Sequence, residues 1–135
     1  MPIAPINPAT AAIGRAGEVE GLAEETRTLR VAEAKFLRAL YYFYTIRQFG
    51  DAVLSLEETQ GVVTEAQRTP VAEIYSAAII PDLQDAIAGL PVEADPGRAT
   101  QGAARHLLAL VYLTRNDPDD AALAEQLGKE VIAGP

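Results

Sequence analysis

Between Leu29 and Ile46 an apolar side chain recurs at every third or fourth position, and this spacing constrains the fold more than any other feature of the chain. The series is Leu29, Ala32, Phe36, Ala39, Phe43 and Ile46. Residues three and four apart lie on one face of an α-helix. Further apolar residues from Leu37 to Tyr44 widen that face. The pattern predicts a long helix over 23–48 that neighbouring elements contact on several sides.

Helical periodicity and capping residues predict four more helices. They are expected at 8–16, 70–90, 100–115 and 119–133, and the inward face of the second carries Tyr75, Ile79, Leu83, Ala86 and Leu90. Asn7, Thr69 and Thr100 are expected N-caps, the first two with proline at the first helical position. Pro81 lacks a backbone N–H inside its helix, which predicts a kink. Because no stretch alternates like a strand, we expect one all-α domain over 1–135, built from antiparallel helical hairpins.

The segment 36–49 holds most of the aromatic residues of the chain, which has five Tyr, three Phe and no Trp. A surface that stacks nucleic-acid bases would combine exposed rings with basic groups, and a sugar-stacking surface often includes Trp. Helical spacing instead predicts that Phe36, Phe43 and Tyr44 pack in the core. Four consecutive aromatic residues cannot all face one way, so the placement of Tyr41 and Tyr42 stays open.

Charge and composition exclude several classes of protein. The formal net charge is −8, with 11 Lys and Arg against 19 Asp and Glu, which argues against nucleic-acid and anionic-membrane partners. Cysteine is absent, which excludes disulfides, thiol catalysis and a lipidation Cys. No apolar run approaches membrane-spanning length, and the first residues do not resemble a signal peptide. We therefore expect a soluble chain.

Residues suited to catalysis are sparse. His106 is the only histidine, and Ser55 and Ser76 are the only serines, so no nucleophile, base and orienting group can be assembled. Asp82 and Asp85 could be paired carboxylates, but the simpler interpretation is one solvated helix face. The sequence therefore predicts neither an enzyme nor a cofactor site.

The turn Asn116–Asp120 gathers oxygen-bearing side chains that calcium ligation would use. It lacks the alternating ligands and the glycine of an EF-hand loop. Asp117, or Asp119 with its neighbour, would more simply cap the following helix and interact with its dipole. Calcium binding at this turn stays open at the level of sequence.

Three blocks of sequence closely resemble successive blocks of the SusD/RagB family. They are "EAKFLRALYYFYTIRQFGD", "TPVAEIYSAAIIPDLQDAIAGLP" and "GRATQGAARHLLALVYL", in the order and spacing of that family. "INPATAAI" resembles the end of the helix that precedes them. The resemblance implies a scaffold of hairpins like those of tetratricopeptide repeats (TPR), with Leu108, Ala109, Tyr112 and Ala121 matching part of a repeat. It also implies that the chain is a fragment of a protein several-fold longer.

By the same resemblance, the chain would be the non-enzymatic scaffold of an outer-membrane, cell-surface lipoprotein. Such a protein binds glycans or peptides and works with a SusC-like TonB-dependent transporter. The alternative is a free-standing TPR-like adaptor that binds a peptide or protein. Ligand-binding residues of the family do not map onto these blocks, so the ligand site is unknown.

Four residues are expected to face outward on a protein-binding surface: Arg38, Tyr42, Arg47 and Gln48. Tyr and Arg are the side chains that most often anchor protein interfaces. We expect the fragment to be monomeric and to bind no oligosaccharide tightly by itself, because most of its rings are committed to helix packing.

Overall fold

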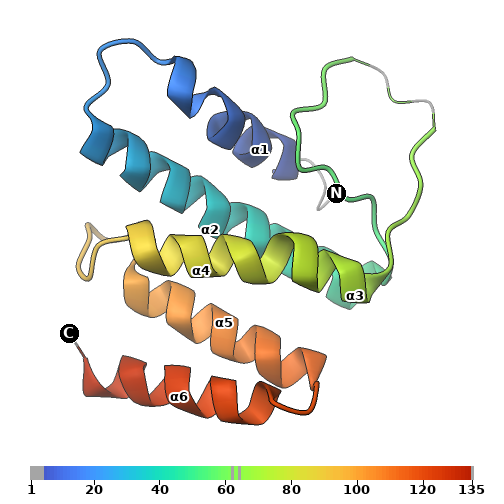
Figure 1. The fold of residues 1–135 in the computed structure, drawn as a ribbon, viewed down its shortest axis with the longest axis vertical. Helices are drawn as coiled ribbons and strands as arrows, with labels where there is room; N and C mark the ends of the chain where they lie inside the picture. The colour runs from blue at the N-terminus through green and yellow to red at the C-terminus, as the bar shows by residue number, and fades with distance from the viewer. Residues whose placement is uncertain (1–4, 62, 64, 135) are drawn as a thin grey trace.

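The computed structural model describes residues 5–61, 63 and 65–134. Helices make up most of the described residues, and none of these belongs to a strand. A single antiparallel bridge joins Ala52 and Thr69. The all-α prediction is confirmed: α1, α2, α4, α5 and α6 follow one another across the molecule as antiparallel, TPR-like hairpins (Figure 1).

The elements have these bounds: α1 Ile6–Arg15, the 3₁₀ turn η1 Ala16–Glu18, α2 Glu24–Phe49, α3 Val71–Ile74, the π-helical stretch η2 Tyr75–Ile79, α4 Ile80–Gly89, α5 Gln101–Arg115 and α6 Asp120–Ala133. Each α-helix from α4 onward packs mainly against its neighbours in the chain, and α2 packs against both α1 and α4.

The ends of α2 and α5 follow from local chemistry. Glu24 and Glu25 lie in the first turn of α2, where negative charge interacts favourably with the helix dipole. Gly50 ends this helix with φ 72°, a conformation that glycine adopts without steric cost. The predicted cap of α5 is confirmed, because the N–H of Ala103 donates to Thr100 Oγ1 at 3.2 Å.

Two other predicted caps are wrong, because tertiary contacts take their place. Helix α1 begins at Ile6, and Asn7 lies inside it; its Oδ1 accepts from the N–H of Thr59 at 2.9 Å. At the start of α3, the N–H of Val71 donates to Oδ1 of Asp51, also at 2.9 Å. Thr69 instead pairs its backbone with Ala52.

The kink expected at Pro81 stays a prediction, and the irregularity that the structure shows is a π-helical turn just before this residue. Residues Tyr75–Ile79 are π-helical, and the N–H of Ile80 donates to the carbonyl of Tyr75, five residues earlier. Proline cannot donate to the carbonyl four residues before it, so the regular ladder is interrupted at this point. A π-helical turn lets the chain continue as one helical rod into α4.

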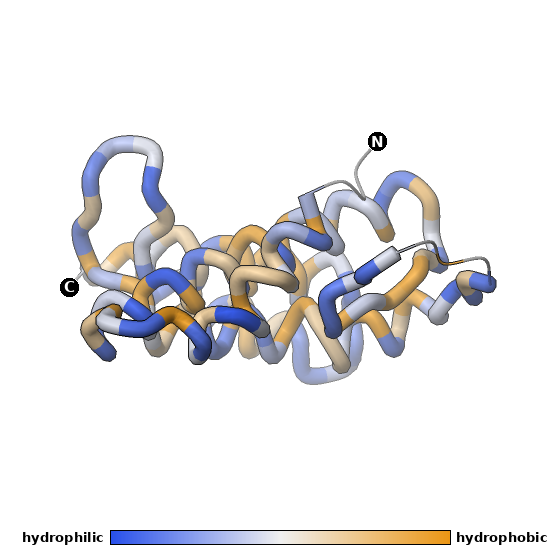
Figure 2. The backbone as a smooth tube through the Cα atoms, turned by 90° about the horizontal axis from the view of Figure 1, so that it is seen from above, coloured by the Kyte–Doolittle hydropathy of each residue, from blue (hydrophilic) through white to orange (hydrophobic). Residues whose placement is uncertain are grey.

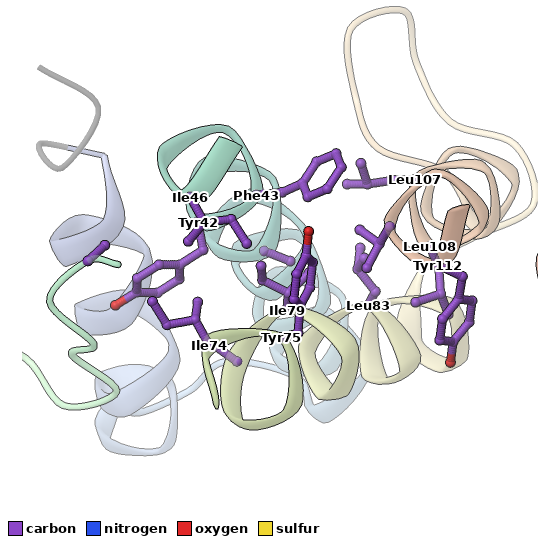
Figure 3. Packing of buried hydrophobic residues seen from close by; sticks show 14 of the residues in the cluster. Tyr42, Phe43, Ile46, Ile74, Tyr75, Ile79, Leu83, Leu107, Leu108 and Tyr112 are labelled. Atoms are coloured by element: carbon purple, nitrogen blue, oxygen red, sulfur yellow. The ribbon is translucent and has the colours of Figure 1, made fainter. Parts of the chain in front are cut away.

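One core cluster joins α2, η2, α4 and α5, with smaller contributions from α1 and α6 (Figure 3). Hydrophobic and hydrophilic residues are interspersed along the helices, as expected for helices with one apolar face (Figure 2). Phe43 is fully buried and Phe36 packs against the cluster, as predicted. The prediction for Tyr44 is wrong: this side chain is 46% exposed, whereas its neighbour Tyr42 is 1% exposed.

Candidate functional site

Arg38 was expected on an outward surface, but it is buried between α2 and α4. Its Nε and Nη2 donate to the two carboxylate oxygens of Asp82 at 2.7 and 2.8 Å. The two side chains are only 8% and 5% exposed. The expectation of a solvated Asp82 is therefore wrong as well, whereas Asp85 is exposed and pairs with Lys35. The two opposite charges are tolerated in the interior because the guanidinium and the carboxylate pair with each other through two hydrogen bonds.

Tyr42 is likewise directed inward, where its hydroxyl binds the backbone of Ser55. The N–H of Ser55 donates to Tyr42 Oη at 2.8 Å, and the hydroxyl donates to the Ser55 carbonyl at 3.2 Å. Burial raises the pKa of Tyr42, and the hydrogen bond from Ser55 opposes that rise. The ring therefore anchors the segment that follows α2 and is not available as an interface residue in this structure.

A hollow of about 530 Å³ lies beside Tyr42, between α1 and the segment 53–67. Its walls are mainly apolar, with Asn7, Thr59 and Glu65 among the polar residues at its lining. The segment is held against α1 by Arg15, whose guanidinium binds both carboxylate oxygens of Glu58. The hollow offers apolar contact and a few hydrogen-bonding groups, but no arrangement suited to acid–base chemistry.

Arg47 and Gln48 are exposed at the end of α2, as expected, and their role in an interface stays a prediction. The Arg47 guanidinium lies over the Phe43 ring, with Cζ 5.2 Å from the ring centroid. This cation–π contact holds the charge at a defined place on the surface.

The histidine and serines have ordinary structural positions. His106 is exposed on α5. The Ser76 hydroxyl donates to carbonyls of its own helix, and that of Ser55 donates to the carbonyl of Glu57. Within 5–61, 63 and 65–134, no three His, Cys, Asp or Glu side chains come together in a way that could hold a metal.

The acidic turn before α6 is organised by Asp120. Its carboxylate accepts two hydrogen bonds from Arg115 and one from the N–H of Asp117. Asp119 occupies the N-cap position of α6 without a side-chain hydrogen bond. Asn116 ends α5 in the left-handed conformation, with φ 60°. Sequence reasoning missed the central role of Asp120, although an Arg five residues from an Asp across a tight turn was a visible signal.

The arrangement of helices and the matched sequence agree on a family. A family model described as "Starch-binding associating with outer membrane", of SusD-like type, matches residues 5–113. The chain belongs to the SusD-like family. No helix in the described part of this SusD-like chain is long and apolar enough to cross a membrane.

Relatives and solved structures agree with this family. A SusD-like protein of Bacteroides ovatus is 37% identical over 120 residues, which cover 82% of this chain and 22% of the relative. The crystal structure of a SusD superfamily protein from Parabacteroides distasonis superposes with a TM-score of 0.89 at 37% identity, covering 98% of this chain and 30% of that one. A laminarin-binding SusD-like protein gives a TM-score of 0.80 at 30% identity, covering 90% and 27%. This SusD-like chain therefore spans less than a third of the length of these proteins.

Proposed function

We propose that these residues form the non-enzymatic helical scaffold of a surface glycan-binding protein that works with a SusC-like TonB-dependent transporter. The observation that carries the proposal is the family match over 5–113, together with the small share of each longer relative that the chain covers. The laminarin-binding relative supports a glycan as the ligand class.

In this proposal, the scaffold positions ligand-contacting regions without supplying the main sugar-binding face. Sugar recognition needs an exposed aromatic face beside convergent polar groups. Tyr42 and Phe43 are buried in the helix packing, and Tyr44 lies exposed on a different face of α2. A free-standing adaptor is less well supported, because the family match places the same helices inside much longer proteins.

A chimera with the laminarin-binding relative tests the scaffold role. The matched 27% of that protein would be replaced by this chain, and laminarin binding measured by calorimetry. We expect the chimera to keep laminarin affinity within about tenfold of the parent protein, a difference of roughly 1.4 kcal/mol. The isolated chain should show no saturable binding to laminarin oligosaccharides below roughly millimolar concentration.

Two results would contradict the scaffold role. One is sub-millimolar glycan binding by the isolated chain, with chemical-shift changes centred on Tyr41 or Tyr44. The other is a chimera with native helicity and an intact melting transition that no longer binds laminarin. Association with a transporter is a separate question, which co-purification of a membrane-anchored parent protein with its transporter would test.

A further inference from the structure

Arg47 differs from almost every other cation of this chain. The sequence has 11 lysines and arginines against 19 acidic residues. In the described residues, all of these cations except Arg47 and Arg68 have a carboxylate oxygen within 4.0 Å. An unpaired guanidinium in so acidic a chain is an exception, and the Phe43 ring holds this one in place.

Tyr75 supplies a second donor group, directed toward the Phe43 ring over which the Arg47 guanidinium lies. Tyr75 is only 6% exposed, but its hydroxyl oxygen is not among the buried polar atoms without a partner in the described residues, so the hydroxyl reaches the solvent. Figure 3 shows the hydroxyl pointing away from its own helix, toward the space between Phe43 and Leu107. Burial raises the pKa of Tyr75, and Arg47 is the charge that most opposes this rise.

Apolar side chains surround these two donors. Helices α2 and α5 run in the same direction, and Phe43 and Leu107 point toward one another across them (Figures 1 and 3). Tyr44 lies one turn before Arg47 on α2 and is 46% exposed, and Leu110 lies one turn after Leu107 on α5 and is 39% exposed. We call Tyr44, Arg47, Tyr75 and Leu110 the Arg47 surface.

We propose that the Arg47 surface docks a carboxylate-bearing apolar segment from the part of a SusD-like polypeptide that lies outside these 135 residues. A guanidinium beside a hydroxyl presents several donors to a single carboxylate, which is the group that a fixed guanidinium binds best. Tyr44 and Leu110 would contact apolar residues on either side of that carboxylate.

The length of the relatives is the reason for choosing this occupant. The chain covers 22% of the Bacteroides ovatus protein and 30% of the Parabacteroides distasonis structure. In such proteins most of the polypeptide is tethered to this scaffold and is present at a high effective concentration. Tyr44 and Leu110 are exposed apolar side chains that a tethered segment would cover, and the exposed Arg47 guanidinium would attract an acidic group of that segment. The proposal does not depend on glycan binding.

Peptides from the Bacteroides ovatus relative provide the test. Overlapping peptides of roughly 15 residues, long enough to hold a short recognition segment, would cover the part of that protein outside the match. Each would be titrated into the ¹⁵N-labelled chain. At least one peptide with Asp or Glu between apolar residues should shift the resonances of Arg47 and Tyr75. Arg47→Gln should weaken that peptide about tenfold, as expected for removing one partner of a close charge pair.

Matched variants separate this mechanism from general charge attraction. Arg68→Gln removes the other unpaired cation and should leave affinity unchanged. Tyr75→Phe should weaken binding at an unchanged melting temperature. Replacing the acidic residue of the peptide by its amide should weaken binding to the wild-type chain but not further weaken binding to Arg47→Gln. The proposal is wrong if no peptide depends on Arg47, or if Arg68→Gln loses as much affinity. It is also wrong if sedimentation shows an Arg47-dependent dimer, because a second copy would then occupy the surface.

Discussion

At the scale of single residues, charged side chains join segments that are distant in the sequence. Arg38 of α2 binds Asp82 of α4, and Arg98 donates two hydrogen bonds to Glu33, 65 residues earlier. The two pairs differ in burial, since Arg98 is 43% exposed and Arg38 only 8%. Exposed pairs contribute little to stability, whereas breaking a buried one leaves an uncompensated charge inside the protein.

The buried pair should therefore be sensitive to the loss of one partner. Asp82→Ala leaves the Arg38 guanidinium without its carboxylate and should lower the free energy of unfolding by about 3–5 kcal/mol. The double variant Arg38→Met/Asp82→Leu should recover much of this loss. Urea denaturation measures both. Asp85→Ala, which removes the exposed partner of Lys35, is the control and should cost no more than about 1 kcal/mol. Equal losses for Asp82→Ala and Asp85→Ala would rule this interpretation out.

Asp120 makes stability depend on pH in the acid range. The hydrogen bond from Arg115 lowers the pKa of Asp120, and burial opposes this only in part. In the unfolded chain the pKa of this carboxyl is about 3.9. Between the two pKa values the unfolded state binds more protons. The contribution is therefore present above the unfolded pKa and is lost as pH falls through the folded pKa.

Asp120→Asn tests this dependence. The difference in the free energy of unfolding between wild type and variant should be largest at neutral pH and should shrink as pH falls below about 4. Denaturant titrations at a series of pH values measure it. Asp119→Asn, which alters an exposed carboxylate without a side-chain hydrogen bond, is the control and should change the free energy of unfolding little at neutral pH. A constant difference for Asp120→Asn would refute the assigned cause.

At the scale of elements, α2 and α4 approach each other closely where Gly89 faces Ala32. A Cβ placed on Gly89 would lie 2.8 Å from Cβ of Ala32, closer than two carbon atoms pack. The absence of a side chain at this position lets the end of α4 approach α2. Gly128 of α6 is the opposite case, because a Cβ there would meet nothing within 4 Å.

The two glycines should respond in opposite ways to alanine. Gly89→Ala should destabilise the protein by about 1–3 kcal/mol through overpacking, despite the higher helix propensity of alanine. Gly128→Ala should stabilise it by up to about 1 kcal/mol, because only the propensity changes. Thermal unfolding of both variants measures this. A higher melting temperature for Gly89→Ala would mean that α4 can move away from α2 without loss.

At the scale of the whole molecule, the core is a single layer of neighbouring helices. Because each helix packs mainly on the next, several apolar side chains on the outer faces stay uncovered. Leu113 is 60% exposed, Phe49 58% and Ile132 87%. Exposed apolar surface of this kind commonly marks an interaction surface.

The helices themselves were predictable from sequence because their signals are local. Every position of the series from Leu29 to Ile46 is buried or partly buried, and so is the predicted face from Tyr75 to Leu90. Gly50 and Thr100 end and begin helices as predicted, through contacts with residues at most four positions away. Periodicity and capping act over one or two turns, so one sequence determines them.

The placement of polar and aromatic side chains was decided only by the tertiary structure. Arg38 and Tyr42 were predicted to face outward because helical periodicity alone describes one packed face. Helix α2 is covered by α1 as well as by α4, so side chains beyond that face are also buried. Their partners, Asp82 and the backbone of Ser55, lie 44 and 13 residues away. A charged or hydroxyl group is stable in the interior only when such a partner reaches it, and which partner does so depends on how the helices pack.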